Sequence, residues 1–188
     1  MPGELLRDRG LTLLRAHVKN QNLLKHSLAV EALMKALARK FSENEELWGL
    51  AGLVHDLDWE ETQNDFERHS LVAAEILEKE GFPAEVVKAV KIHNYVHGLT
   101  PETPLEKALY ATEEITGLIA AAVLVLPSRK IVDLKPESVL NRMKEKAFAR
   151  GVNRDIINLT PSFLGISVAE LTEIALGAMR EIHEELGL

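Results

Sequence analysis

The chain has 188 residues, enough for one domain of ordinary size, and 46% of them are hydrophobic while 27% are charged. Its formal net charge of −7 argues against a protein that grips a nucleic acid polymer through its overall field, because such binding needs a basic surface. There are no cysteines, which excludes disulfides and thiolate sites, so any transition metal must be held by imidazole and carboxylate groups.

Nearly every segment has a helical period, and the sequence predicts a single all-α domain that covers residues 1–188. We expect helices at about 4–17, 21–41, 43–57, 66–80, 83–95, 104–126, 136–149 and 167–186, with a short one near 153–158. The expected start signals are Ser42 with Glu45, Thr103 with Glu106, Ser167 with Glu170, and Pro83 and Pro136 in first turns. Residues 21–126 are predicted to form the functional core, with the helices at 136–187 packed on it.

The N-terminal residues 1–9 are charged and lack the apolar core of a signal peptide. The most apolar stretch, 115–127, is too short to span a bilayer. We therefore expect a cytoplasmic protein with no membrane partner, and association into a homo-oligomer is left open.

Five of the predicted helices place a histidine or an acid among apolar neighbours at three- and four-residue spacing. His69, for example, is predicted to share a helix face with Phe66, Ala73 and Ile76. In chain order, the candidates are His26, the pair His55-Asp56, His69, His93, and either Glu113 or Glu114. Helical geometry alone does not choose between the two glutamates.

A single histidine on an apolar face is more often a core residue bonded to a carbonyl than a ligand. Four inward histidines and two acids each need a partner, however, because an unpaired buried charge costs roughly several kcal/mol. A shared divalent ion satisfies them together. Imidazole with carboxylate is the ligand set expected for Fe, Mn, Zn or Ni, and one or two ions are expected.

The ordered set resembles the HD-domain superfamily of metal-dependent phosphohydrolases, which implies an HD-type helical bundle. The resemblance extends to residues 22–31, 55–60, 108–117 and 146–154, which look like a group of predicted HD hydrolases of bacteria and archaea. Alignment of Thr116-Gly117 places Glu113 where the family normally has Asp.

The resemblance implies hydrolysis of a small phosphate ester, a nucleotide first among them, by a metal-activated water. One ion would be held by His26, His55, Asp56 and Glu113, and a second by Asp56, His69 and His93. Asp56 and Asp58 are the catalytic candidates. Asp58 and Glu60 would orient ligands or carry protons, although a solvated helix end is the simpler interpretation of both.

A phosphate substrate also needs cationic and polar partners. The candidates are Lys25 beside His26, Asn94 and His97 on the His93 face, the pair Arg129-Lys130, and Arg154. No glycine-rich phosphate loop is present, so a nucleotide would bind in a pocket between helices.

Two other functions compete with hydrolysis. A di-iron oxygenase would use the same ligands to activate oxygen. A non-catalytic sensor would bind a nucleotide without cleaving it, and the glutamate at position 113 keeps that alternative open.

Overall fold

Helices supply all the regular structure in the computed structural model, which describes residues 2–188, with side chains from residue 5 onward. The longer ones are α1 (Pro2–His17), α2 (Gln21–Phe41), α3 (Glu45–Val54), α5 (Leu71–Lys79), α6 (Ala84–His93), α7 (Pro104–Leu124), α8 (Pro136–Met143) and α11 (Val168–Glu181). The short ones are α4 (Trp59–Thr62), α9 (Arg154–Ile157), α10 (Thr160–Leu164), α12 (His183–Leu186) and the 3₁₀ turns η1 (Tyr95–His97) and η2 (Ile131–Asp133). The prediction of an all-α fold is confirmed.

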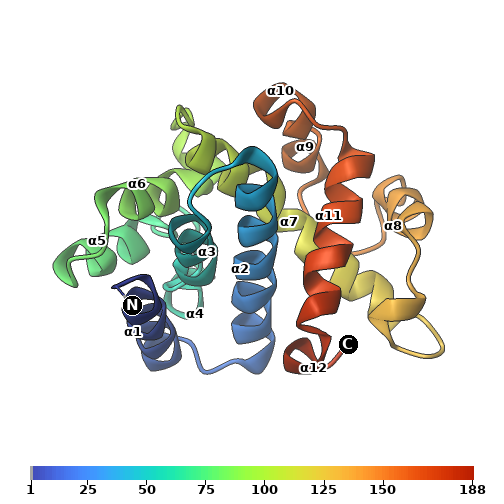
Figure 1. Cartoon of the computed structure of the whole chain (residues 1–188), viewed down its shortest axis with the longest axis horizontal. Coiled ribbons are helices and arrows are strands. Elements are labelled where there is room, and N and C mark those ends of the chain that lie inside the picture. The colour runs from blue at the N-terminus through green and yellow to red at the C-terminus, as the bar shows by residue number, and fades with distance from the viewer. Residues whose placement is uncertain (1) are drawn as a thin grey trace.

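Helices α2 and α7 form the centre of the domain. Figure 1 shows α2 between α3 and α11, with α7 passing behind them, and α2 packs on all three of these helices. One stripe of α2 is buried, including Val30, Leu33 and Leu37, as expected for an amphipathic helix. Because neighbours cover α7 on several sides, it is apolar around most of its circumference.

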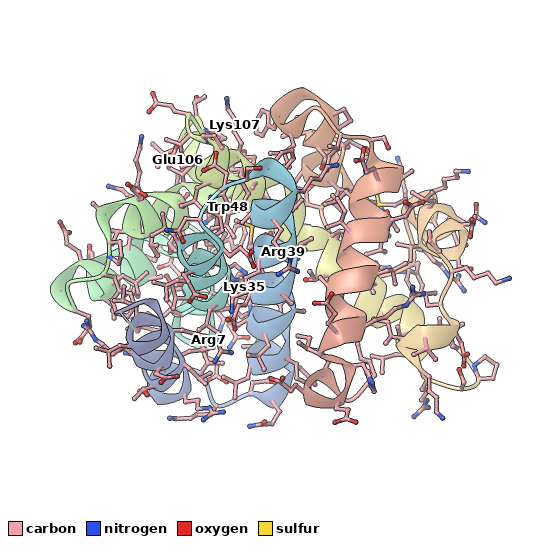
Figure 2. All side chains as sticks on the ribbon, in the orientation of Figure 1. Arg7, Lys35, Arg39, Trp48, Glu106 and Lys107 are labelled. Atoms are coloured by element: carbon pink, nitrogen blue, oxygen red, sulfur yellow. The ribbon has the colours of Figure 1, made fainter. Side chains whose placement is uncertain are left out.

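Arg7 of α1 anchors that helix to α2. Its Nη2 donates to the buried carboxylate of Glu31 at 3.0 Å, and the Nζ of Lys35 reaches the same carboxylate at 2.7 Å. Figure 2 labels Arg7 and Lys35, which lie near each other beside α2. Two cations therefore satisfy one buried acid, which would otherwise be costly to fold.

The expected start signals are confirmed except at Ser42 and Pro83. Ser42 ends α2 in the left-handed conformation (φ 57°), and the side chain of Asn44 instead begins α3. Pro83 precedes the first turn of α6 rather than lying in it. The expected caps at Thr103–Glu106, Ser167–Glu170 and Pro136 are present.

Three predicted helices are wrong in extent. The helix expected at 66–80 begins only at Leu71, so His69 does not share a helix face with Phe66. The helix expected at 136–149 ends at Met143, and the helix expected at 167–186 is interrupted at Ile182. Contacts with distant residues accompany two of these differences. Asp58 accepts from Ser70 and Ala73 at the start of α5, and Arg154 donates to the carbonyls of Arg142 and Met143 at the end of α8.

No single described helix is long and apolar enough to cross a membrane. The segments Arg154–Leu164 and Val168–Glu181, bent by 102°, meet the length and composition requirement only as a pair.

Candidate metal centre

Four histidines and one aspartate converge although four separate segments supply them. His26 lies in the second turn of α2, His55 and Asp56 follow α3, His69 precedes α5, and His93 is the last residue of α6. Most of these positions are helix ends, where the chain changes direction. Side chains from helices of different orientation can therefore meet at one point.

Asp56 lies at the centre of this cluster. Its Oδ1 is 3.4 Å from Nε2 of His55 and 3.5 Å from Nε2 of both His69 and His93. Its Oδ2 is 3.6 Å from Nε2 of His26. The ligand atoms form two groups, His26–His55–Asp56 and Asp56–His69–His93, each with its atoms within 4.8 Å of one another. The shared carboxylate is placed to bridge two ions.

The outer nitrogen of each ring, Nδ1, faces an acceptor supplied by the protein. The pairs are His55 with Gly52 O (2.8 Å), His93 with Val90 O (2.6 Å), His69 with Asp58 Oδ1 (2.9 Å) and His26 with Thr116 Oγ1 (3.2 Å). The Thr116 hydroxyl is free to accept because its own proton goes to Glu113 O. With a proton on Nδ1, each neutral ring directs its Nε2 lone pair inward.

The inward nitrogens approach one another in a way that calls for a cation. Nε2 of His26 lies 3.2 Å from Nε2 of His55, and the same distance separates His69 from His93. Burial lowers the pKa of His26 and lowers the pKa of His55 to about 3, so protonating these two rings is unfavourable. Paired lone pairs beside a carboxylate fit a divalent metal of the Fe, Mn, Zn or Ni class.

Of the two neighbouring glutamates, Glu113 contacts a histidine of this cluster, and Glu114 contacts the backbone of another segment. Its Oε2 is 3.7 Å from Nε2 of His26, whereas Glu114 accepts from the backbone of Asn153. Burial raises the pKa of Glu113 well above its usual value, the charge of Glu114 adds to this effect, and burial raises the pKa of Glu114 to about 7. A nearby cation would offset this crowding of negative charge. The geometry favours Glu113 as the last ligand, and that role stays a prediction.

Asp58 is buried, which corrects the interpretation of a solvated helix end. Its Oδ1 accepts from His69 Nδ1, and its Oδ2 accepts from the backbone N–H groups of Ser70 (2.8 Å) and Ala73 (3.0 Å). Both oxygens accept hydrogen bonds, so the structure supports the orienting role of Asp58 toward His69, and its proton-carrying role stays a prediction. Glu60 instead accepts from the backbone of Lys19 and Asn20 in the α1–α2 loop.

Three of the predicted phosphate-binding cations do not lie among the ligand atoms, and their contact with substrate stays a prediction. Arg154 donates to six backbone carbonyls between residues 142 and 152, so it holds the loop after α8 together. Arg129 and Lys130 are exposed beyond the end of α7, which itself runs about 16 Å past Glu113. Lys25 lies beside His26 on α2 and lines a neighbouring cavity.

Asn94 and His97 support the turn that carries His69. The amide nitrogen of Asn94 donates to the carbonyls of Phe66 (2.9 Å) and His69 (3.1 Å). The Nε2 of His97 lies 2.8 Å from the carbonyl of His69. Asn94 also lines the cavity over the cluster, and contact of either residue with substrate stays a prediction.

A cavity of about 290 Å³ opens over the cluster and reveals residues that the sequence analysis missed. Trp59, Phe66 and Tyr95 form an aromatic wall beside His69. The ring of Phe66 stacks on the imidazole ring of His69, with 5.6 Å between the ring centroids. Thr116, which orients His26, was also missed as a site residue. The aromatic residues near each histidine were the only available signal, and core packing explains such residues equally well.

Gly52 permits the close approach of α2 and α3 that joins His26 to His55. A Cβ at this position would lie 2.7 Å from the carbonyl oxygen of Val30, a backbone atom that cannot move aside. We expect Gly52→Ala to lower the free energy of unfolding by about 2–3 kcal/mol, as overpacking does, and to weaken metal binding. Denaturant unfolding measures the loss.

Gly177 provides the control, because no atom lies within 4 Å of a Cβ built there. Gly177→Ala is expected to be neutral or to stabilise by about 0.5–1 kcal/mol, since alanine favours the helix. Equal effects of the two substitutions would contradict the close approach at Gly52.

Comparison with known proteins gives a consistent result. The family model described as HD domain matches residues 23–123, more than half of the chain. Ribonuclease Y of Desulfotalea psychrophila is 26% identical over 171 residues, 88% of this chain and 32% of that protein. Ribonuclease Y of Rubrobacter xylanophilus is 25% identical over 191 residues, 99% of this chain and 36% of that protein. The chain thus spans about a third of the length of these relatives.

Proposed function

The chain belongs to the HD domain family, and we propose that it is a phosphohydrolase that cleaves a small phosphate ester with a metal-activated water. The observation that carries the proposal is the pair of ligand groups that share Asp56. The cavity of about 290 Å³ over these ligand atoms would admit water and a phosphoryl group. This arrangement suits hydrolysis of a P–O bond.

Divalent ions at this centre would polarise a phosphoryl oxygen and lower the pKa of a bound water toward neutrality. The chain itself fixes the geometry of the ligands. Asp58 and Thr116 hold the rings of His69 and His26 by hydrogen bonds to Nδ1, so each Nε2 points inward. In the reaction, water adds its oxygen to phosphorus, the bond to the leaving oxygen breaks, and that oxygen gains a proton.

The surroundings favour a small substrate over a polymer. None of the residues lining the cavity over the cluster, in the part of the chain described, is a lysine or arginine. A nucleic acid polymer is normally held through many phosphate contacts with basic side chains, and this chain carries a net charge of −7. The relatives are named ribonucleases, which supports phosphoester chemistry and makes RNA the competing substrate.

The aromatic wall supports a nucleotide as the first class to test. Tyr95 is 41% exposed and contacts Phe66, with 5.8 Å between the ring centroids, while Trp59 lies edge-on to Phe66. A planar base can stack on such rings without a sequence-specific contact.

The test combines metal analysis with a substrate screen. Protein purified without chelator is expected to hold about two equivalents of Fe or Mn and to release phosphate from nucleotides or 4-nitrophenyl phosphate. Chelation should abolish turnover and added Mn²⁺ should restore it. His55→Ala should lose both metal and activity, whereas His17→Ala, at an exposed site, should keep both.

Each alternative predicts a different result. Faster cleavage of an RNA oligonucleotide than of any small ester would replace the small substrate. Oxygen consumption by iron-loaded protein would indicate an oxygenase. Tight nucleotide binding without turnover would indicate a sensor, and protein that takes up no metal would end the proposal.

A further inference from the structure

A second cavity of about 450 Å³ lies next to the metal centre, between α2, α7, α11 and α12. Figure 1 shows α11 and α12 on one side of α2, and α3 to α6, which carry most of the histidines, on the other. Most of the side chains that line this cavity are apolar, among them Ala29, Ala120, Ala121, Leu124, Met179 and Leu186, and the polar ones are Asn22, Lys25, His26 and Thr116. Its size falls within the range of small-molecule sites in proteins, about 300–1,000 Å³.

The two cavities adjoin at His26 and Gly117, which line both. Gly117 keeps the junction open because it has no side chain. A Cβ at this position would meet only a methyl group of Val152, at 3.7 Å. His26 lies between the cavities, with Nε2 toward Asp56 and Nδ1 toward Thr116. This shared wall at Gly117 is where a molecule bound at the metal centre would pass into the apolar cavity.

We propose that this cavity binds an aliphatic group of the substrate, so that the preferred ester carries an alkyl chain on one of its phosphate oxygens. The inference rests on the proposed function, because the phosphate must lie at the metal centre. The wall offers methyl and methylene groups and one flexible thioether, which adapt to a chain better than to a polar group. Leu124 is 57% exposed, and a bound chain would cover part of it.

Lys25 is the lysine of this wall, and its Nζ lies against Gly187, 2.9 Å from the place that a Cβ would take there. The ammonium group therefore borders the cavity beside the end of α12, and the phosphate of the substrate would be held at the metal centre. The aromatic wall around Trp59 is left free for a group on another phosphate oxygen.

The test uses methyl-, butyl- and octylphosphonate, which cannot be hydrolysed at an ester bond, titrated into the purified full chain by calorimetry. Each buried methylene should improve affinity about threefold, and octylphosphonate should bind at least about 100-fold more tightly than methylphosphonate. Ala121 lines the apolar cavity but not the cavity over the metal centre. Ala121→Leu fills the apolar cavity and should therefore reduce that ratio of affinities at least about tenfold. Gly177→Leu adds the same side chain to the open surface of α11 and should leave the ratio unchanged.

The outcomes separate this inference from the proposed function. Phosphatase activity with no dependence of affinity on chain length would overturn the inference alone. Chain-length dependence without any turnover would support the cavity and contradict the hydrolase. A dimer that Ala121→Leu dissociates, measured by sedimentation, would show that a second copy occupies the cavity and would overturn the inference.

Discussion

Asp56→Asn is expected to remove both metal ions and to lower turnover at least about 1,000-fold. The carboxylate belongs to both ligand groups, so its loss weakens both at once. Metal ions contribute several kcal/mol to such reactions, and each 1.36 kcal/mol is a factor of ten in rate. Elemental analysis and steady-state kinetics measure the two effects.

Asp65→Asn is the matched control, because Asp65 is an exposed acid only nine residues further along the chain. It should keep both ions and full activity. Circular dichroism of Asp56→Asn should match that of the original protein, so that lost metal is not confused with unfolding. Two retained ions in folded Asp56→Asn would contradict a bridging role.

Asp58→Ala is expected to cost about 3 kcal/mol of stability and to empty one half of the centre. The substitution leaves the N–H groups of Ser70 and Ala73 without their acceptor, and each buried unsatisfied group costs about 1–3 kcal/mol. It also frees the ring of His69 to rotate, and loss of such an outer partner typically weakens metal binding about 10–100-fold.

The readout that separates positioning from general destabilisation is metal stoichiometry. The ion held by His69 and His93 should be lost first, while the ion held by His26 and His55 is retained. Asp58→Asn, which keeps an oxygen acceptor, should recover part of the stability, and Asp65→Ala should change neither property. Equal loss of both ions in a folded Asp58→Ala protein would contradict the role.

Local sequence patterns were sufficient for much of this fold. The stripe around His26 predicts the buried face of α2, and Thr103 with Glu106 predicts the start of α7, because both depend on residues within one or two turns. The expectation that the histidines share one site followed from counting buried polar groups that need a partner, and the resemblance to the HD superfamily implied that Asp56 serves both ions. The buried face and the start of a helix can be predicted because residues close in sequence determine them.

The features that could not be predicted depend on residues distant in sequence. The turn before α5 exists because Asp58 binds Ser70 and Ala73 across more than ten residues. Likewise, nothing local distinguishes Arg154, which binds six carbonyls, from a surface arginine that binds phosphate. Periodicity describes one helix at a time, so contacts between segments must come from the structure.

The convergence of ligands from four segments has a consequence for the folded chain itself. His26 and His93 are 67 positions apart in sequence, and each ion would join segments whose ends are otherwise free to separate. Binding only to the native state stabilises it by mass action, and each ion must be released before the segments that it joins can separate. The ions would therefore act as reversible cross-links, and the resistance of the domain to proteases would follow the metal supply.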